Sequence, residues 1–476
     1  MTKTRQILFL ILIFILAFVV RLYRIDNPIA DWHSWRQADT ASITRNFIKQ
    51  GFTPLFPKFD SVVSLNQYAD QNPDRFFFAE FPIYNILVYP LYKHFGVNVI
   101  YHRLVSVLFS SLTIFSLFFL TKIFSSTFTA YTASLIFALL PYNIYYGRVT
   151  MPDPLHVFFA VTSLLFVNLW LKHQKIYLSV LAGLLYALTI LTKPYGLVLL
   201  LPITYLILSK LLSKKPIKIT SIILFLIISL TPYLLWKIHI DNYPQGQFGT
   251  AWLFNSTNIR FRPAFFRWLV FERFNNLILG GGGFVLVCFG LISPKTKKES
   301  LFYLSWLTSL VVFLVIIATG NVTHDYYQLP FVPILSIFAA LGIEHLLKIG
   351  QKTWQKIFNT CLALALFTMM LAMGWYQAKQ LFNVNNWPIV EAGIKADQIL
   401  PEDALVIAPY NNDPAFLYQT NRWGWTNQVY HLDQVKQQYH KPIYLVSVSK
   451  DDYTNTIKAQ YPTVLETDNF IIIKIQ

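Results

Sequence analysis

The sequence predicts a mostly α-helical protein that crosses a membrane many times and carries a small α/β domain in its C-terminal part. Of its 476 residues, 55% are hydrophobic and only 13% are charged. A soluble domain of this composition could not bury its apolar surface, so a bilayer is the expected environment. A second observation is a series of about eleven apolar runs, each near the roughly 20 residues that a membrane-spanning helix needs. A third is a polar C-terminal segment of roughly 100 residues, which is enough for a small domain.

The first apolar run resembles a signal peptide. Arg21 and Arg24 stand after it, where a small-residue cleavage site would be expected, so we interpret the run as an uncleaved anchor. The predicted spans fall near residues 6–24, 99–122, 127–146, 154–171, 177–192, 194–210, 217–238, 274–293, 300–319, 329–348 and 355–375.

Basic residues in the short loops predict the orientation. If the spans alternate in direction, six basic loops all lie on one side, and short loops rich in Lys and Arg are cytoplasmic. We therefore expect a multi-pass protein of the cell (plasma or inner) membrane, with its N-terminus inside and its C-terminal domain outside. These loops contain Lys3 and Arg5; Lys122; Lys172 and Lys175; Lys210, Lys214, Lys215 and Lys218; Lys295, Lys297 and Lys298; and Lys348, Lys352 and Lys356.

The alternation holds only if residues 78–95 do not cross the membrane. This segment contains two prolines and Glu80 among aromatic residues, a composition that suits an interfacial or re-entrant helix. Counting it as a span would place every later lysine cluster outside, so we reject that interpretation.

The formal net charge of +16 does not indicate nucleic-acid binding, because the lysines lie between apolar spans as topology signals do. The two cysteines, Cys288 and Cys361, lie in apolar runs and indicate neither a disulfide framework nor a thiolate metal site. We therefore expect the membrane, not a nucleic acid, as the environment of this chain.

Two domains are predicted. Residues 1–375 form the transmembrane domain, with a long outer loop at 25–98 that includes interfacial helices. Residues 376–476 form the α/β domain, with strands at 404–408, 443–448 and 470–475 and a helix at 432–439. Tyr410, Trp423 and Trp425 offer surfaces on which sugar rings could stack, although packing of a small domain explains them equally well.

Residues 31–39 (DWHSWRQAD) are the first candidate site. Asp31 and Asp39 are eight residues apart and would share a helix face, and Arg36 and His33 lie between them. A carboxylate facing an apolar cavity can act as a general base, and an adjacent arginine can hold a phosphate. The alternative is a juxtamembrane helix with Asp31 as its N-cap and Trp and Arg as interface anchors.

Residues 141–154 (PYNIYYGRVTMPDP) concentrate Tyr146, Arg148 and Asp153 on the same outer side, as further candidates for binding or catalysis. The alternative is that Asp153 caps the following helix and that Arg148 extends to the lipid headgroups.

Two further outer loops contain candidate residues. Lys193, in residues 192–196 (TKPYG), is a lone outward lysine, which a simple turn would also explain. His324 and Tyr327, in residues 321–330 (NVTHDYYQLP), could hydrogen-bond a lipid phosphate or a sugar, or belong to an aromatic belt. The spans carry few charges away from their ends, whereas an ion-coupled transporter usually has an ionisable group near mid-membrane. Together the four clusters indicate chemistry in one pocket at the outer face.

These residues resemble the GT-C superfamily of membrane glycosyltransferases, in the branch of protein O-mannosyltransferase-like, aminoarabinose transferase-like and RgtA/B/C/D-like enzymes. The resemblance spans roughly residues 6–375 and depends on the order of several short motifs. These are an acidic outer loop ending in residues 43–47 (ITRNF), residues 80–82 (EFP), residues 102–104 (HRL), the Tyr-rich loop with Asp153, residues 192–196, and residues 324–330.

The resemblance implies a polyprenyl-phosphate-linked sugar as donor and a lipid, glycan or protein as acceptor. Direct attack by an acceptor hydroxyl at C1 would invert the anomeric centre, and the departing phosphate gains negative charge that preorganised cations can stabilise. We expect Asp39 or Asp31 as base and Asp153 as the residue that orients sugar or acceptor. The expected donor phosphate or lipid contacts are Arg36, Arg148, Lys193, His324 and Tyr327, and the expected acceptor or sugar contacts are His33, Glu80 and Tyr146.

Two departures from the relatives affect this prediction. Where many relatives have adjacent Asp and Glu, this chain has Arg36 and Gln37, so both Asp39 and Asp31 stay candidates for the base. Aminoarabinose transferases have a lysine where this chain has Phe81, which weakens the case for that donor. No cofactor is indicated beyond a divalent cation, for which Glu80 is the weak candidate ligand. The alternatives are a glycan polymerase or ligase that uses a pyrophosphate-linked lipid, and a lipid or polysaccharide transporter without catalysis.

Overall fold

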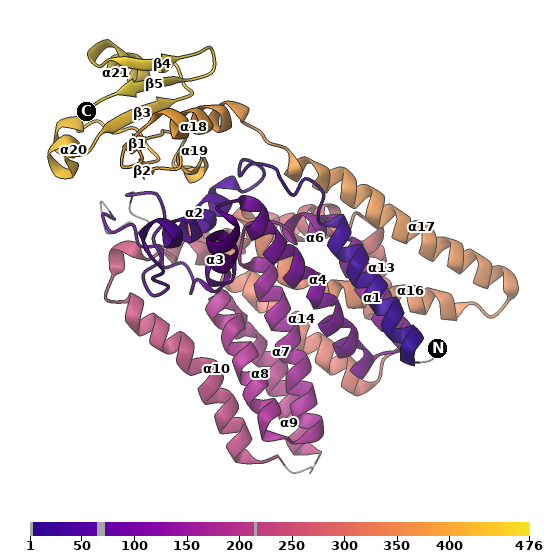
Figure 1. Cartoon of the computed structure of the whole chain (residues 1–476). Coiled ribbons are helices and arrows are strands. Elements are labelled where there is room, and N and C mark those ends of the chain that lie inside the picture. Colours follow the sequence, from indigo (N-terminus) through magenta and orange to yellow (C-terminus); the bar gives the residue numbers. More distant parts are fainter. Residues whose placement is uncertain (1–2, 64–71, 214–216) are drawn as a thin grey trace. The chain divides into compact units, whose positions relative to one another are not determined.

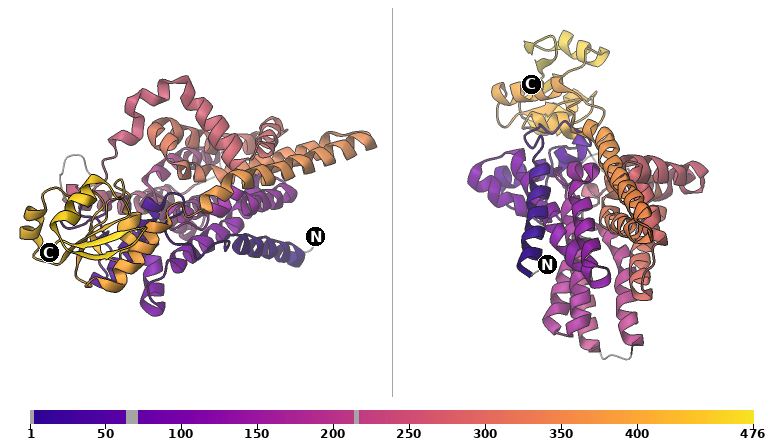
Figure 2. Two further views of the ribbon diagram at one scale, coloured as in Figure 1. Left: turned by 90° about the horizontal axis from the view of Figure 1, so that it is seen from above. Right: turned by 90° about the vertical axis from the view of Figure 1, so that its right-hand side faces the viewer.

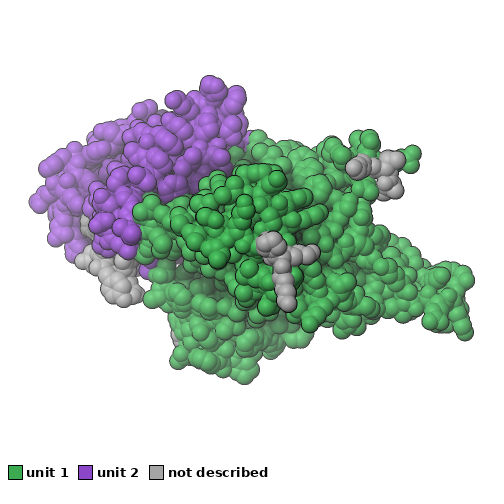
Figure 3. Space-filling view, turned by 90° about the horizontal axis from the view of Figure 1, so that it is seen from below, with its two compact units in different colours: residues 1–25, 104–237, 250–380 green, residues 26–103, 238–249, 381–476 purple. Residues whose placement is uncertain are grey.

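The computed structural model describes residues 3–63, 72–213 and 217–476 (Figure 1). Lys214 and Lys215, two of the predicted cytoplasmic lysines, lie outside these described residues. The chain forms two compact units, which Figure 3 shows in different colours. Unit 1 comprises residues 1–25, 104–237 and 250–380, and unit 2 comprises residues 26–103, 238–249 and 381–476.

Unit 1 is built from long apolar helices. Figures 1 and 2 show α7, α8 and α9 running side by side, in agreement with the contacts of α7 with both of the others. Its helices are α1 (Lys3–Val20), α5 (Thr127–Leu139), α6 (Pro141–Tyr146), α7 (Asp153–His173), α8 (Ile176–Thr192), η1 (Pro194–Leu199), α9 (Leu200–Leu212), α11 (Ala251–Asn255), η3 (Ser256–Phe261), α12 (Pro263–Arg267), η4 (Trp268–Ile278), α13 (Gly282–Ile292), α14 (Lys297–Ile316), α15 (Ala318–Thr323), η5 (Asp325–Phe331), α16 (Val332–Ile349) and α17 (Thr353–Ala378), together with most of α4 (Val99–Phe124) and α10 (Ile219–Ile240).

The predicted polytopic helical fold class is confirmed. Among the described residues, seven helices are long and apolar enough to cross a membrane, or up to eight if one bent pair forms a single span. The remaining predicted spans coincide with three shorter apolar helices, Thr4–Val20, Thr127–Leu139 and Ile176–Thr192.

Two predicted spans are broken rather than continuous. The segment predicted at 274–293 is two helices, η4 and α13, bent by 111°. Gly280 and Gly281 lie at this break with φ of 50° and 66°, a conformation that glycine adopts without a Cβ clash. The segment predicted at 127–146 is divided before Pro141, because a proline disfavours a helical conformation in the residue before it.

Close helix packing in unit 1 depends on glycine. A Cβ on Gly290 of α13 would lie 1.8 Å from the carbonyl oxygen of Phe338, and a Cβ on Gly342 of α16 would lie 2.0 Å from that of Leu286. Small residues let helix backbones approach each other in membranes, where hydrophobic burial between helices contributes little. The two glycines therefore determine how closely α13 and α16 pack.

Unit 2 combines the outer-loop region with the C-terminal segment. Its five-stranded sheet has the order β2-β1-β3-β5-β4, with β1 parallel to β2 and β3, and with β5 antiparallel to β3 and β4. Its elements are α2 (Ser34–Gln50), α3 (Ile83–Phe95), η2 (Pro244–Gly246), α18 (Trp387–Ile399), α19 (Pro414–Gln419), α20 (Leu432–Tyr439), α21 (Asp452–Gln460), β1 (Leu405–Ile407), β2 (Trp423–Trp425), β3 (Ile443–Ser447), β4 (Thr463–Glu466) and β5 (Ile471–Lys474), and η6 (Lys379–Phe382) begins just before residue 381.

Helix α2 is polar in sequence yet buried from Arg36 to Phe47. Ala38 and Ala41, three residues apart and so on one helix face, join a hydrophobic core with residues of α18, α19, β1 and β3. Beyond α2, the backbone N–H of Val62 donates to the carbonyl of Gly424 at 2.9 Å, so the loop continues the sheet beside β2. The first candidate site therefore stands on a helix that packs both on α3, which follows it in the outer-loop region, and on elements of the C-terminal segment.

Candidate functional site

The residues from Asp31 to Asp39 lie at the start of α2 in unit 2. His33 precedes the helix in a left-handed conformation, with φ of 55°. This sharp turn places Asp31 before the helix and leaves Arg36 and Asp39 on its first turns, all three of them buried. We call Asp31, Arg36, Asp39 and the partners described next the α2 cluster.

Asp31 is held by two partners. Its Oδ2 lies 3.5 Å from Nη2 of Arg103, and both side chains are fully buried. Its Oδ1 accepts a hydrogen bond of 2.6 Å from the Gln37 amide. A buried carboxylate with one oxygen in an ion pair and the other in a hydrogen bond supports structure more directly than it supports proton transfer.

Asp39 has a different environment. Its side chain is buried, and within the described residues its carboxylate forms no hydrogen bond or ion pair. Burial raises the pKa of Asp39 well above its ordinary value, nearby Arg36 partly opposes the shift, and the charge of Asp413 adds to it. A desolvated carboxylate with a raised pKa is a stronger proton acceptor, as a general base requires.

Arg36 connects the cluster to the segment that precedes α3. Its guanidinium forms an ion pair with Glu80 and lies 5.2 Å from the ring centroid of Phe77. Arg36 and Asp39 are three residues apart on α2 and are therefore neighbours on the helix surface. The cluster thus places a cation beside the candidate base.

In unit 1, Asp153 begins α7 and is almost fully buried. Nζ of Lys193 lies 3.4 Å from Oδ2 of Asp153, and the Tyr195 hydroxyl donates to Oδ1 at 3.4 Å. Pro194 begins η1 directly after Lys193, so the chain ends α8 and turns at this point. The position of Lys193 therefore follows from the turn in residues 192–196.

Residues 324–327 lie beside Lys193 and Tyr195. The Lys193 ammonium lies 6.0 Å from the ring centroid of Tyr326, whose ring stacks on His324 at 5.2 Å. Tyr327 lies 5.9 Å from Tyr195 and 5.5 Å from His324, measured between ring centroids. We call these residues, Asp153, Lys193, Tyr195, His324, Tyr326 and Tyr327, the Asp153 cluster.

The predicted residues Tyr146 and Arg148 make other contacts. The Tyr146 hydroxyl donates to Asp325, whose second oxygen lies 3.5 Å from Arg273. The Arg148 guanidinium donates to the carbonyl of Arg24 at 3.0 Å. Arg148 therefore ties the chain after α1 in place, and its predicted phosphate contact stays a prediction.

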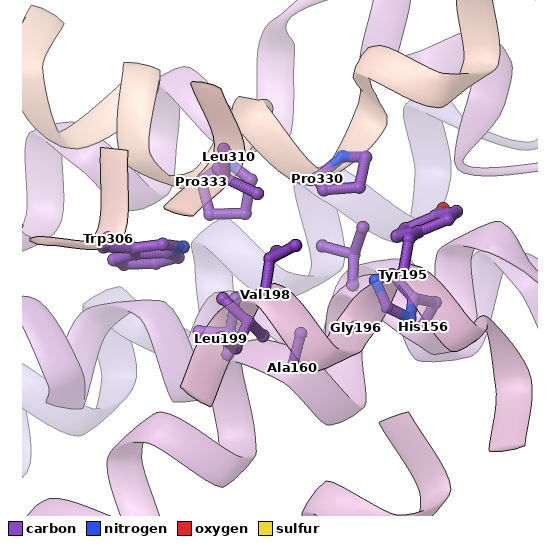
Figure 4. Close-up of a pocket in the computed structure, with 12 residues that line it drawn as sticks. His156, Ala160, Tyr195, Gly196, Val198, Leu199, Trp306, Leu310, Pro330 and Pro333 are labelled. Atoms are coloured by element: carbon purple, nitrogen blue, oxygen red, sulfur yellow. The ribbon is translucent and has the colours of Figure 1, made fainter. Parts of the chain in front are cut away.

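An apolar pocket adjoins the Asp153 cluster within unit 1. Tyr195 belongs to both, and Figure 4 shows Tyr195 and His156 at one end of the pocket and Trp306 at the other. A Cβ on Gly196 would lie 2.9 Å from Thr189 and 3.0 Å from His156, so this glycine lets η1 pack closely. The remaining lining residues are Val157, Ala160, Val161, Val198, Leu199, Leu310, Pro330 and Pro333.

The sequence reasoning missed several residues of these sites. Asp325 stood inside a quoted motif, but Arg273 had no signal because it lies at the edge of an apolar run. Asp413, whose charge contributes to the raised pKa of Asp39, lies more than 370 residues further along the chain.

Within the described parts of the chain, no group of three or more His, Cys, Asp or Glu side chains is placed to hold a metal ion.

One stretch of the chain matches a known protein family. Residues 82–236 match the family described as dolichyl-phosphate-mannose-protein mannosyltransferase. No curated protein sequence matches this chain.

Among solved structures, the chain is similar to ArnT from Cupriavidus metallidurans bound to undecaprenyl phosphate, at 16% identity and a TM-score of 0.66, over 100% of this chain and 98% of that one. It is also similar to the Archaeoglobus fulgidus oligosaccharyltransferase with a tethered acceptor peptide, at 12% identity and a TM-score of 0.56, over 94% and 69% of the two chains. AglB from the same organism, in complex with an inhibitory peptide and a dolichol-phosphate, matches at 11% identity and a TM-score of 0.52, over 92% and 69%. At these identities the likeness establishes a shared fold.

Proposed function

We propose that this chain is a membrane glycosyltransferase of the GT-C superfamily and that it takes its sugar from a polyprenyl-phosphate-linked donor. The observation that carries the proposal is the likeness in fold to ArnT bound to undecaprenyl phosphate, which extends over 100% of this chain. The likeness to AglB with dolichol-phosphate supports the same class of lipid.

The base in this proposal is Asp39. The acceptor hydroxyl attacks C1 of the sugar, its proton passes to the Asp39 carboxylate, and the bond between C1 and the phosphate oxygen breaks with inversion. Asp39 suits this step because burial raises its pKa and because its carboxylate forms no hydrogen bond or ion pair within the described residues. Asp31 suits it less, since Arg103 and Gln37 already engage both of its oxygens.

The leaving group is a polyprenyl phosphate that gains negative charge as the bond breaks. A cation already in place stabilises that charge more than a mobile one does. In unit 2 we propose Arg36 for this role, because its pairing with Glu80 holds the guanidinium in a defined position. Arg36 is also close to Asp39 along α2.

In unit 1 we propose that Lys193 binds an anionic group of the lipid substrate, with His324 and Tyr327 as hydrogen-bonding neighbours. Asp153 holds the ammonium at 3.4 Å, which fixes a long, flexible side chain. The apolar pocket beside Tyr195 has a volume of only about 10 Å³, so the proposal for Lys193 rests on the Asp153 cluster alone.

The test uses purified protein in proteoliposomes with a panel of undecaprenyl-phosphate-linked sugars. We expect transfer by the unaltered chain, a loss of about 10²–10⁴-fold in kcat for Asp39→Asn, and unchanged kcat for the control Asp403→Asn, at an exposed position of unit 2. Mass spectrometry should detect undecaprenyl monophosphate as the product.

Three results would contradict the proposal in different ways. Release of polyprenyl pyrophosphate from a pyrophosphate-linked donor would indicate the polymerase or ligase. Lipid flux without covalent transfer would indicate a transporter. Full activity of Asp39→Asn would reject Asp39 as the base while leaving the donor class intact.

A further inference from the structure

A pocket in unit 2 lies outside the residues assigned to the transfer step. It is lined by Trp35 of α2 and by Tyr410, Asn411, Asn412 and Asp413, which connect β1 to α19. Its volume of about 370 Å³ falls within the range of roughly 300–1,000 Å³ typical of small-molecule sites. The pocket therefore has room for a sugar ring.

Contacts within unit 2 fix the shape of this pocket. The backbone N–H of Asp413 donates to the carbonyl of Tyr410 at 2.7 Å, which closes a tight turn. Asn411 and Asn412 inside the turn have φ of 51° and 63°. Two successive left-handed residues that are not glycine cost energy, and asparagine tolerates this conformation better than most residues do. The turn directs two amide-bearing residues to the pocket.

Other side chains of unit 2 also contact Tyr410 and Trp35, the two aromatic walls of the pocket. The Tyr410 hydroxyl accepts a hydrogen bond of 3.2 Å from Asn386, and its ring packs on Phe416 with 6.3 Å between centroids. The Trp35 ring lies 6.5 Å from that of His33. Both aromatic residues therefore belong to a framework that is present without a ligand.

The chemistry of the walls favours a carbohydrate. The C–H faces of a sugar stack on aromatic rings, while its hydroxyls bond to amides and carboxylates. Asn411 and Asn412 supply amides, and Asp413 supplies a carboxylate with one oxygen 3.4 Å from the Ser34 hydroxyl. A carboxylate in the wall disfavours a phosphate, and no lysine or arginine is among the lining residues.

The pocket adjoins the proposed base. Trp35 and Asp39 are four residues apart on α2, so their side chains are neighbours on one face of the helix. The charge of Asp413 also acts on Asp39. A ring that stacks on Trp35 would therefore lie about one helix turn from Asp39.

We propose that the pocket formed by Trp35, Tyr410, Asn411, Asn412 and Asp413 binds a sugar ring of the acceptor, so that the acceptor is a glycan. This inference rests on the proposed function, because it assigns the acceptor class of the same reaction.

Binding can be measured without any donor. The probes are methyl glycosides of glucose, galactose, mannose and N-acetylglucosamine, added to the full chain in nanodiscs and observed by saturation-transfer difference NMR. We expect signal transfer to the ring protons of at least one glycoside. Trp35→Ala should reduce that transfer at least fivefold, and so should Asn412→Gly, which removes the amide and keeps the left-handed backbone.

The matched control is Trp387→Ala, because Trp387 is 53% exposed, belongs to unit 2 and lies outside the pocket lining. Its binding signal should equal that of the unaltered chain. Asn412 is exposed, so the Asn412→Gly variant reports on binding even if Trp35→Ala fails to fold.

The outcomes separate this inference from the proposed function. Absence of signal transfer from all four glycosides, or equal transfer in Asn412→Gly, would overturn the glycan pocket whether or not the chain transfers sugar. Binding of a peptide panel that depends on Trp35 would also overturn it. Conversely, failure of the donor assay with intact, Asn412-dependent glycoside binding would reject the donor class alone.

Discussion

The sequence leaves Asp31 and Asp39 as equal candidates for the base, but the two side chains have different surroundings in the structure. Asp31 shares a buried ion pair with Arg103, whereas burial raises the pKa of Asp39 and the described residues give its carboxylate no hydrogen bond. Removing one partner of a buried pair leaves an uncompensated charge, but neutralising a desolvated, unpaired carboxylate removes a cost. The two residues should therefore respond to the same substitution in opposite ways.

Stability measurements can detect this difference. We expect Asp31→Asn to destabilise the protein by about 3–5 kcal/mol, because Arg103 loses its counter-ion. Asp39→Asn should leave the melting temperature equal or higher. Thermal unfolding in detergent, followed by tryptophan fluorescence, checks both. Equal losses in the two variants would contradict the proposed assignment of Asp31 to structure and of Asp39 to catalysis.

The pH dependence of transfer should also report on Asp39. Only the ionised carboxylate accepts a proton, so the rate should rise with pH through the raised pKa of Asp39. Asp413, whose own pKa burial raises to about 6, adds negative charge that favours the protonated form of Asp39. Asp413→Asn should therefore lower the pKa of Asp39 and move the acidic limb of the kcat profile to lower pH. Saturating acceptor keeps binding effects out of kcat, and a shift to higher pH would contradict the prediction.

At the scale of elements, α13 and α16 provide a test of packing. In Gly342→Ala the new Cβ would lie 2.0 Å from the Leu286 carbonyl oxygen, so the helices must move apart. We expect a loss of about 1–3 kcal/mol, as overpacking usually causes, measured as a lower unfolding temperature. Leu291→Ala, at a position of α13 that is 43% exposed, is the control and should change little. An unchanged melting temperature in Gly342→Ala would reject the close contact.

The sequence predicted elements well where the physical signal is local. The apolar spans all coincide with helices, predicted strands 404–408, 443–448 and 470–475 coincide with β1, β3 and β5, and the helix at 432–439 is α20. Strands β2 and β4 were missed because neither is a continuous apolar run: β2 (WGW) has a central glycine, and β4 (TVLE) has polar ends and is largely exposed.

Long-range partners had no local signal. The pattern of residues 31–39 indicated a cluster of charged side chains, but it could not reveal that Arg103 engages Asp31 or that Glu80 engages Arg36. The grouping of Asp153 with Lys193 likewise joins two helix ends that are 40 residues apart. Each pairing depends on the tertiary fold, so the choice between Asp31 and Asp39 required the structure.

At the scale of the whole molecule, the chain is a multi-pass membrane protein, and we propose the orientation that its lysines predict. With Cys288 and Cys361 replaced by serine, a single cysteine at Asp403 should react with a membrane-impermeant maleimide in intact cells. A single cysteine at Lys297 should react only after permeabilisation. Both positions are exposed, and the reverse pattern of labelling would contradict an outer location of the C-terminal segment.

The make-up of unit 2 also sets an order of events during synthesis. Helix α2 leaves the ribosome early, whereas the strands and helices whose core receives Ala38 and Ala41 are made last. A short polar helix is marginal on its own. Helix α3 is made soon after α2 and packs on it, but the rest of its support arrives only with those late partners. The surroundings of Asp39, the proposed base, are therefore complete only at the end of translation, because α19 and Asp413 are among the late partners.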